Sequence, residues 1–423
     1  MLSFPDARRK VIEVVTAISR GRAKAPTEHV ALDASLGRVL AAPVNADRDY
    51  PPFNRSTRDG YAVRAADLRE AGVTLQLVGE IAAGQAFGRT IQAGECVQIM
   101  TGAAPPEGAD AVEMIEYTRL EEDSDSNSKT PFGRMAFPGR VHFDRAARAG
   151  QNIVPRGSEA RAGQTLLRAG ARLGYVELSL AAQVGCVRPE VWERPQIGIL
   201  STGDEVINAA ETPGPLQIRN GNSFSLAAQV ESAGAEAVLL GNAPDEAVEL
   251  KRRIEEGLKL DALVLSGGVS AGKYDLVEGV LAELGAEIYF DRVAIRPGQP
   301  AVFAECAGKP VFGLPGNPVS TMVTFELFVL PALDILGGTE ARPLPLLRAK
   351  LGAQLREKPS LAHFLPARIE WTSGEPIVTN VRWRGSGDVV ALADTNCFLV
   401  VHESKLDWEI GEWIDVMPRR GAL

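Results

Sequence analysis

The feature that most constrains this chain is the alternation of apolar runs and amphipathic stretches between Gln196 and Leu336. Four apolar runs in this region predict β-strands: 197–203, 235–241, 262–268 and 310–316. The intervening stretches have helical periodicity: 222–234, 245–258, 274–285 and 318–336. Strands that alternate with helices form a parallel sheet covered on both faces, and ligands of such sheets bind beyond the carboxyl ends of the strands. We therefore look for a site in the loops at those ends.

The flanking segments have other patterns. Residues 4–20 predict an amphipathic helix, and 160–187 are also compatible with helix and could pack against it. Short apolar runs separated by Gly and Pro predict β structure before residue 148, and alternation after about residue 341 predicts a small β-barrel or sandwich. We predict an α/β and β multidomain protein of four parts: a split helical linker domain at 1–45 and 149–190, an inserted β domain at 46–148, an α/β domain at 191–340, and a C-terminal β domain at 341–423. Within the inserted domain, the polar stretch Glu121–Gly139 predicts a surface loop.

Charge and cysteine content exclude several classes of protein. A net charge of −9 argues against a general nucleic-acid-binding protein, because no basic face can neutralise phosphates. The four cysteines are isolated from one another and from the histidines, which argues against zinc and fits a reducing compartment. The N-terminus has no apolar leader, and no run approaches the length of a membrane span. We expect a cytoplasmic protein with no nucleic-acid or membrane partner.

Four loops of the α/β segment share one construction, in which an apolar strand is followed by small residues and then by the start of a helix. They are STGDE (201–205), SGGVSAGKYD (266–275), RPGQP (296–300) and LPGNPVS (314–320). Glycines let the backbone approach a ligand closely, and free amides and hydroxyls at helix N-termini suit an oxyanion. Any one loop alone is more often a plain strand–turn–helix junction, whereas four in this order indicate a pocket for a long anionic ligand.

Two acidic residues, Glu205 and Asp275, stand among these loops. A carboxylate beside an anion pocket is repulsive unless a cation lies between them, and Mg²⁺ held by carboxylates and phosphates would resolve the conflict. The alternative is that both residues lie at helix N-termini, where the helix dipole favours negative charge.

The loop motifs in combination closely resemble the MoeA-type molybdopterin molybdotransferase family, which includes the C-terminal part of gephyrin. The central motifs are STGDE (201–205), SGGVSAGKYDLV (266–277) and GLPGNPVS (313–320). The resemblance extends to PPFNRSTRDGYAV (51–63), IMTGAAPPEGADAVEMIE (99–116), less closely QNIVPRGSEARAG (151–163), and GSGDVVALADTNCFLVV (385–401). It therefore spans almost the whole chain in the family's order.

The resemblance implies an enzyme of molybdenum cofactor biosynthesis. Its reaction is the Mg²⁺-dependent insertion of molybdate into adenylated molybdopterin, with release of AMP. The α/β domain would bind molybdopterin. The family forms an elongated homodimer, in which Asp59 and Thr101 would face the cleft of the partner. A molybdopterin adenylyltransferase and molybdoenzymes or their chaperones are implied as further partners.

The resemblance also implies the residues of the site. Asp59, Glu205 and Asp275 would be catalytic, with Asp275 and Glu205 as the metal ligands. The residues implied in substrate binding are Thr101, Ser201, Thr202, Gly203, Asn222, Ser266, Gly267, Gly268, Ser270, Arg296, Pro297, Gly298, Pro315, Gly316, Asn317, Ser320, Arg368 and Ser386.

Three positions depart from the family's pattern. Asn220 stands where an acidic residue is usual, Gln299 where a second lysine is common, and Pro366 where an arginine is common. Arg368 lies two residues beyond Pro366, hence on the same strand face, and could supply the missing charge. With fewer cations available, we hypothesise that Arg296, Ser320 and Ser386 contact molybdate.

Two other functions remain open at the level of sequence. The first is a binding or scaffold protein of the same family that is catalytically weakened by the missing charges; the presence of Asp59, Glu205 and Asp275 argues for turnover instead. The second is an adenylyltransferase or nucleotide pyrophosphatase built on the same α/β domain, which the long flanking domains disfavour. Molybdate and tungstate are nearly identical in size and charge, so the sequence does not distinguish them.

Overall fold

The computed structural model describes residues 1–21, 26–121, 139–268, 276–357, 361–372, 374–403, 405 and 407–422. These residues form two compact units. The first unit contains residues 1–42, 169–178 and 188–423, and the second contains residues 43–168 and 179–187. The loop predicted at Glu121–Gly139 lies, apart from its two end residues, outside the described part of the chain.

A six-stranded sheet forms the centre of the first unit, with the order β16-β13-β17-β21-β20-β18. Its strands are β13 (Gln196–Thr202), β16 (Glu236–Ala243), β17 (Ala262–Ser266), β18 (Glu287–Phe290), β20 (Val302–Cys306) and β21 (Lys309–Leu314). The four predicted strands are parallel to one another, as expected. The sequence did not predict the other two strands: β20 runs antiparallel to β21, and β18 runs antiparallel to β20 at the edge of the sheet.

The turn between β20 and β21 explains this difference. Ala307 and Gly308 both have positive φ, 51° and 72°, which is the geometry of a tight two-residue hairpin. Such turns are usually signalled by Asn-Gly or Asp-Gly, and Ala-Gly carries no comparable signal. The hairpin was therefore hidden in the sequence.

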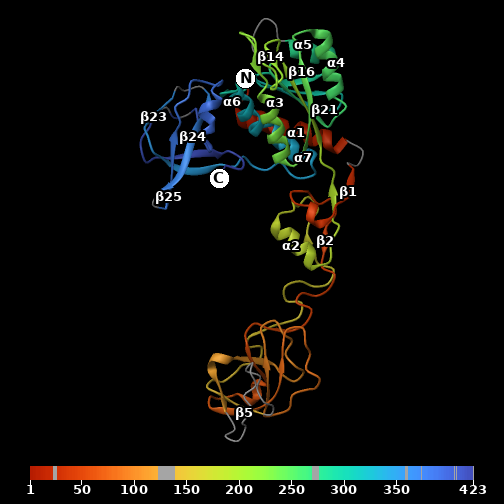
Figure 1. The fold of residues 1–423 in the computed structure, drawn as a ribbon, viewed down its shortest axis with the longest axis vertical. Helices are drawn as coiled ribbons and strands as arrows, with labels where there is room; N and C mark the ends of the chain where they lie inside the picture. The colour runs from red at the N-terminus through yellow and green to blue at the C-terminus, as the bar shows by residue number, and fades with distance from the viewer. Residues whose placement is uncertain are drawn as a thin grey trace. The chain divides into compact units, whose positions relative to one another are not determined.

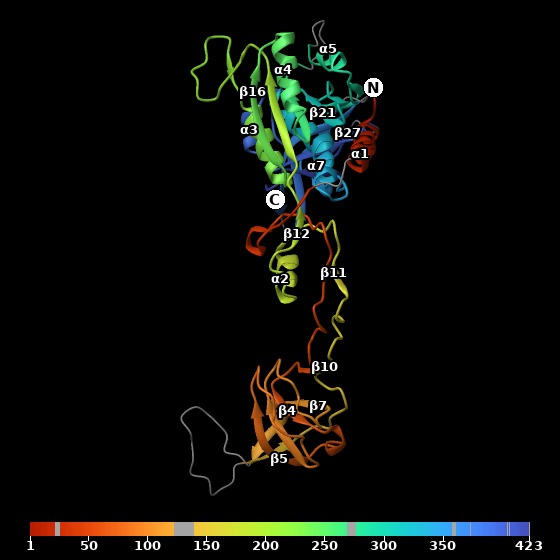
Figure 2. The same cartoon turned by 90° about the vertical axis from the view of Figure 1, so that its right-hand side faces the viewer.

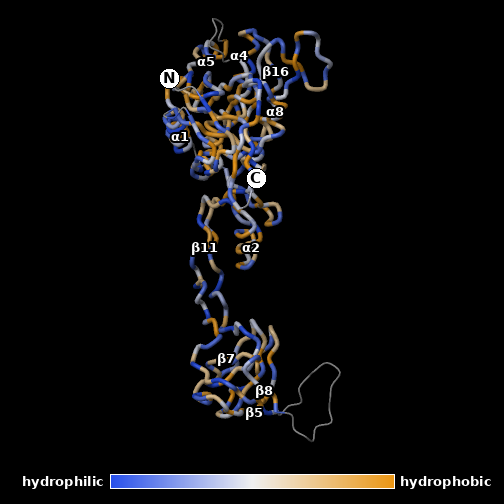
Figure 3. The backbone as a smooth tube through the Cα atoms, turned by 90° about the vertical axis from the view of Figure 1, so that its left-hand side faces the viewer, coloured by the Kyte–Doolittle hydropathy of each residue, from blue (hydrophilic) through white to orange (hydrophobic). Residues whose placement is uncertain are grey.

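Helices cover both faces of the sheet (Figures 1 and 2). They are α1 (Phe4–Gly21), α3 (Asn222–Ala233), α4 (Ala247–Gly257), α5 (Leu276–Glu283), α6 (Pro318–Thr324) and α7 (Leu330–Leu336), with a π-helical stretch at Phe325–Val329 between the last two. One apolar core joins α1, α3, α6 and α7 to one face, and a second joins α4 and α5 to the other. Hydrophobic backbone segments accordingly run through the interior of this domain (Figure 3).

The N-terminal helix α1 packs against α7 of the α/β domain. Its buried stripe includes Val11, Val15 and Ile18, at the helical spacing expected. The expectation that residues 160–187 pack against this helix is not supported, because the apolar core that contains the buried stripe of α1 includes α7 but no residue of that segment. Within that segment only α2 (Tyr175–Gln183) is helical. The continuous stretch Pro318–Leu336 has the length and hydropathy of a membrane span, but 83% of its most apolar 18-residue window is buried inside the protein, as is usual for a core helix.

The C-terminal region is a closed five-stranded β-barrel, which confirms the predicted small barrel. Its order is β24-β25-β22-β28-β26, and pairing of β24 with β26 closes it. The strands are β22 (Leu347–Leu351), β24 (Ala362–Thr372), β25 (Glu375–Asn380), β26 (Cys397–Val401) and β28 (Trp413–Pro418), with helix α8 (Val389–Ala393) and the pair β23 (Leu355–Arg356) and β27 (Asp407–Trp408) beside them. Phe364 and Phe398 extend into the α/β core. The short strand β19 (Ile295–Arg296) crosses from the α/β domain to pair with β24.

The second unit is built on a six-stranded β-sheet, as the sequence predicted for this region. Its order is β7-β4-β6-β5-β9-β8. The strands are β4 (Gly60–Val63), β5 (Val73–Ile81), β6 (Glu95–Ile99), β7 (Ala111–Met114), β8 (Thr118–Glu121) and β9 (Gly139–Phe143). Two apolar clusters, one containing Phe143 and the other Ile99, form its core.

Short paired strands and 3-10 turns complete both units. The pairs are β1 (Thr27–His29) with β12 (Glu190–Trp192), β2 (Val44–Asn45) with β11 (Thr165–Leu167), β3 (Arg55–Ser56) with β10 (Ile153–Val154), and β14 (Val206–Ile207) with β15 (Ile218–Arg219). The 3-10 turns are Leu32–Ala34, Ala65–Asp67 and Ile115–Tyr117.

Candidate active site

The carboxyl ends of β13, β17 and β21 bring three of the predicted loops to one edge of the sheet. Asn222, the first residue of α3, connects two of them. Its Nδ2 donates to Ser266 Oγ and to the Gly316 carbonyl oxygen, both at 2.8 Å. A single amide therefore fixes the loop after β17 against the loop after β21.

Asn220, one of the departures from the family's pattern, organises the loop after β13. Its Nδ2 donates to Ser201 Oγ at 3.0 Å and to Ser223 Oγ at 2.9 Å. Its Oδ1 accepts from the Ser223 amide at 3.0 Å. A carboxylate at this position would only accept hydrogen bonds, so both hydroxyls would have to donate to it, whereas the asparagine amide donates to both hydroxyls and accepts from the Ser223 backbone amide. Asn220 thus acts here as an organiser of the loop.

Glycines allow the three loops to approach one another without side chains between them. Gly267 and Gly268 have φ of +96° and +66°, and a Cβ on either would lie 2.7 Å from an oxygen of Thr202. A Cβ on Gly316 would lie 3.5 Å from the Gly267 Cα. Thr202 Oγ1 is buried and has no hydrogen-bond partner among the described residues. The edge therefore presents bare backbone on which a flat or elongated ligand can lie.

Acidic side chains gather beside this edge. A Cβ on Gly203, whose φ is +128°, would lie 2.5 Å from Glu205 Oε2, so the Glu205 carboxylate folds back over the end of β13. Asp204 Oδ1 accepts from the Asp245 amide at 3.0 Å. Burial raises the pKa of Asp245, and the negative charges of Asp204 and Glu205 raise it further. Of the other predicted residues of this site, Ser270 and Asp275 lie outside the described residues.

A cavity of about 630 Å³ lies between the α/β domain and the barrel and collects several of the predicted residues. Arg296, Pro297 and Gly298 line it from one side, Pro315, Asn317 and Ser320 from the α6 side, and Ser386 from the barrel. Its remaining lining residues are Ile295, Gln299, Pro300, Leu361, Trp383, Arg384 and Gly385. The loop from Pro315 to Ser320 thus contributes both to the sheet edge and to this cavity.

The segment 381–388 (VRWRGSGD), which we call the barrel loop, supplies residues that the sequence analysis missed. The Val381 amide donates to the Pro366 carbonyl oxygen at 2.9 Å, and the Val319 amide donates to the Ser386 carbonyl oxygen at 3.0 Å. Arg384 lines the cavity from this loop. The only signal in the sequence was its position two residues before Ser386 in RGSGD.

Arg368, proposed from the sequence as a replacement cation, does not line the cavity. Its Nε donates to Glu370 at 2.7 Å, and its side chain also reaches the Asp394 carbonyl oxygen. The face of β24 changes along its length: Pro366 is buried, whereas Arg368 is exposed. Sharing a strand face was therefore not enough to bring Arg368 to the site.

Asp59 and Thr101 lie together in the second unit. The Thr101 amide and Oγ1 donate to Asp59 Oδ1 at 2.6 and 2.8 Å. The backbone bond first, and then the hydroxyl bond, lower the pKa of Asp59 below its ordinary value. Asp59 is thus held as a carboxylate.

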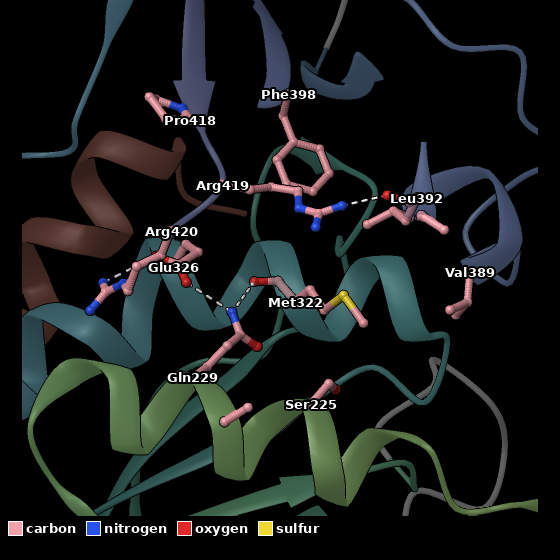
Figure 4. A pocket seen from close by; sticks show the side chains of 12 residues that line it. Ser225, Gln229, Met322, Glu326, Val389, Leu392, Phe398, Pro418, Arg419 and Arg420 are labelled. Atoms are coloured by element: carbon pink, nitrogen blue, oxygen red, sulfur yellow. Dashed lines mark hydrogen bonds and ion pairs between the residues drawn. The ribbon is translucent and has the colours of Figure 1, made fainter. Parts of the chain in front are cut away.

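A second cavity, of about 340 Å³, lies between α3, α6 and the end of the barrel (Figure 4). Its walls are mostly apolar, with Met322 and Phe398 among them. The guanidinium of Arg419 bonds to the Leu392 carbonyl oxygen and that of Arg420 to Glu326 (Figure 4). Its cations are already used within the protein, so this cavity suits an anionic ligand less well than the first.

The sheet with its bare glycine edge, the adjoining barrel and the arginine-lined cavity define a multidomain protein with an α/β ligand-binding domain. Family models identify its class. The chain matches the MoeA N-terminal region (domain I and II) over residues 2–185, a probable molybdopterin binding domain over 198–335, and the MoeA C-terminal region (domain IV) over 348–418.

Known proteins match over most of the chain. A molybdopterin molybdenumtransferase of Bacillus subtilis is 33% identical over 412 residues, covering 96% of this chain and 93% of its own. One from Nostoc is 36% identical over 343 residues, covering 79% and 75%. The solved structure of a MoeA protein from Pyrococcus horikoshii has a TM-score of 0.73 at 30% identity, covering 97% and 98%.

The chain belongs to the MoeA family of molybdenum cofactor biosynthesis enzymes, as the sequence motifs predicted. Its relatives are named as transferases across most of its length, so it is an enzyme, and the alternative of a scaffold without turnover is not favoured.

Proposed function

We propose that this enzyme inserts molybdate into adenylated molybdopterin with release of AMP. The observation that supports this most directly is the loop Pro315–Ser320. Gly316 contributes to the bare sheet edge, while Asn317 and Ser320 contribute to the cavity that holds Arg296. A ligand that extends along the loops can therefore place one end at the edge and the other among hydroxyls and cations.

The chemistry of each region suggests which part of the substrate it binds. The backbone at Gly267, Gly268 and Gly316 leaves room for the pterin and phosphate groups. Arg296 provides a planar cationic donor, and Ser320 and Ser386 provide hydroxyls, for a tetrahedral dianion. These groups would hold molybdate near the dithiolene sulfurs, while release of AMP breaks the phosphoanhydride.

The carboxylates of Glu205 and Asp204 supply oxygen donors of the kind that suits Mg²⁺ beside the edge; burial raises the pKa of the neighbouring Asp245, and the charges of Asp204 and Glu205 raise it further. Carboxylate oxygens are the ligands that Mg²⁺ prefers, together with phosphates of a substrate. Glu205 and Asp275 would hold the ion, which would neutralise phosphate charge and polarise the anhydride. Asp59, held as a carboxylate by Thr101, would orient a water molecule or a ligand.

The assembly and the cellular setting follow from the same proposal. A homodimer would let Asp59 and Thr101 of one subunit complete the cleft of the other. The substrate is an adenylated pterin, so an adenylyltransferase must precede this enzyme, and molybdoenzymes or their chaperones must receive its product. We place the reaction in the cytoplasm, where the four free cysteines would remain reduced.

The first test measures AMP release from adenylated molybdopterin on addition of molybdate and Mg²⁺. Replacing Arg296 by Ala removes a charge-assisted hydrogen bond and should raise the molybdate concentration for half-maximal rate about 10- to 100-fold. The matched control is Arg368→Ala, an exposed arginine outside the cavity, which should leave it unchanged. An Arg296→Ala enzyme with normal molybdate dependence would refute the assignment of Arg296. A wild-type enzyme that releases no AMP would refute the proposed function.

A further inference from the structure

Two arginines of unrelated elements line the same cavity. Arg296 belongs to β19, and Arg384 belongs to the barrel loop. Both are exposed, and among the described residues neither guanidinium has a carboxylate or carbonyl partner within hydrogen-bonding distance. Most arginines of this chain do have such partners, as Arg368 has with Glu370. Two like charges that share a concave, water-accessible space without a counter-charge favour an anion there.

Acidic groups near Arg384 do not neutralise it. Asp388 lies on the same loop, and its carboxylate accepts from the backbone amides of Arg384 and Ala391, at 3.0 and 3.1 Å. These two amides are the main causes of its lowered pKa, and the Arg384 guanidinium contributes least. Asp388 therefore caps α8 and fixes the loop, while the guanidinium stays available to a ligand.

The barrel loop is held on both sides of Arg384. The Val381 amide is bonded to Pro366 before it, and the Ser386 carbonyl oxygen is bonded to Val319 of α6 after it. Trp383 packs against the α/β core and the barrel core at once. A loop anchored at three points presents its arginine with little loss of backbone freedom on binding.

We propose that Arg384 is a second oxyanion-binding residue of this site and determines, with Arg296, how tightly the tetrahedral dianion is held. The inference rests on the proposed function. The ligand is molybdate or an oxyanion of the same shape and charge, and the guanidinium donates two parallel N–H bonds to its oxygens. This charge enters from the barrel loop, whereas β24, where Pro366 stands, contributes none to the cavity.

The test compares Arg384→Gln with Arg382→Gln in the full-length enzyme. Arg382 is the matched control, because it is exposed on the same loop, loses the same charge and does not line the cavity. With adenylated molybdopterin and Mg²⁺ saturating, molybdate is varied and AMP release is measured. Arg384→Gln should raise the half-saturating molybdate concentration about 10- to 100-fold. The half-saturating concentration of the pterin and all values for Arg382→Gln should be unchanged.

Two further measurements separate binding from folding. Equilibrium dialysis with radiolabelled molybdate should show the same loss of affinity for Arg384→Gln without turnover. Arg384→Lys, which keeps the positive charge but not the planar guanidinium, should retain part of the affinity for molybdate that Arg384→Gln loses. The inference is overturned if Arg384→Gln behaves like Arg382→Gln, or if it weakens pterin and molybdate equally. If the wild-type enzyme itself shows no molybdate-dependent release, the proposed function fails, and that outcome is distinguished by the wild type alone.

Discussion

At the scale of single residues, Asp59 shows how local hydrogen bonds decide the role of a side chain. Its Oδ1 accepts two bonds from Thr101, one from the amide and one from the hydroxyl. Both bonds favour the charged form, so the pKa of Asp59 lies below its ordinary value. A group whose pKa is lowered on folding contributes stability above its unfolded pKa and loses it as the pH falls through the folded one. Asp59 is therefore ionised throughout the neutral range.

The consequence is a prediction about pH dependence. Between about pH 5 and 9, where an unperturbed Asp is already ionised, the rate of AMP release should show no titration that belongs to Asp59. Replacement by Asn should lower the rate by the same factor across this range, because the charge is lost at every pH. The measurement is the pH profile of the wild type and of Asp59→Asn. A limb of the wild-type profile that disappears in Asp59→Asn would show that Asp59 transfers a proton instead.

At the scale of elements, the glycine edge depends on how closely the loops after β13 and β17 approach. Gly268→Ala would place a Cβ 2.7 Å from Thr202 Oγ1 and 2.9 Å from Val277 Cγ2, at a φ of +66°. Left-handed strain and overpacking together should lower the free energy of unfolding by about 2–5 kcal/mol. The activity should fall as well, because the loop must shift to accommodate the methyl group.

Gly285→Ala is the control that separates backbone strain at positive φ from steric contact of the added methyl group. Gly285 follows α5 with a similar φ of +76°, but a Cβ there meets nothing within 4 Å. Gly285→Ala should lower the free energy of unfolding by only about 1–2 kcal/mol and should leave the rate of AMP release unchanged. Urea unfolding of both variants, with AMP release measured beside it, tests the pair. Equal destabilisation of the two would mean that the approach to Thr202 is not tight.

The same scale shows what the sequence could and could not predict. Strong periodicity located the four parallel strands and α1, because burial of one face leaves a regular pattern. The hairpin at Ala307 and Gly308 left none, since its turn depends on backbone conformation and not on a recognisable residue pair. The packing partner of α1 was also not predictable, because an amphipathic stripe indicates that one face of a helix is buried but does not identify the element that covers it.

For the candidate site, the motifs located the residues that lie at the end of a strand or directly after it in the sequence. Ser201, Ser266 and Gly316 meet because carboxyl ends of parallel strands share one edge. Arg384 was missed because its approach to the cavity depends on how the barrel loop is anchored to Pro366 and α6. Arg368 was predicted as a replacement cation from strand alternation alone. Alternation determines on which face of the strand a residue lies but not whether that face borders the cavity.

At the scale of the whole molecule, the predicted catalytic and substrate-binding residues are divided between two compact units. Asp59 belongs to the unit containing residues 43–168, whereas Glu205 and Arg296 belong to the unit of the α/β domain and barrel. Each unit has apolar clusters of its own, so each unit can hold its share of the site residues in place without the other. In the proposed homodimer, a complete site takes one half from each subunit.

This arrangement predicts complementation between two inactive variants. Asp59→Asn and Arg296→Ala should each be nearly inactive alone at limiting molybdate. In a mixed dimer, one cleft combines the intact Arg296 of one subunit with the intact Asp59 of the other, while the second cleft contains both defects. Random exchange at equal concentrations makes half of the dimers mixed, so AMP release should recover to about a quarter of the wild-type rate.

The control mixes Arg296→Ala with Arg384→Gln, whose altered residues lie in the same cavity of one unit. Every cleft of that mixture carries one of the two defects, so no recovery is expected there. Exchange must be verified by mass spectrometry of differently tagged subunits, because a lack of mixing would imitate a lack of complementation. If mixed dimers form and activity does not rise above that of the separate variants, each subunit uses its own Asp59. The proposal of a shared cleft would then be wrong, while the assignment of Arg296 to the molybdate end would be unaffected.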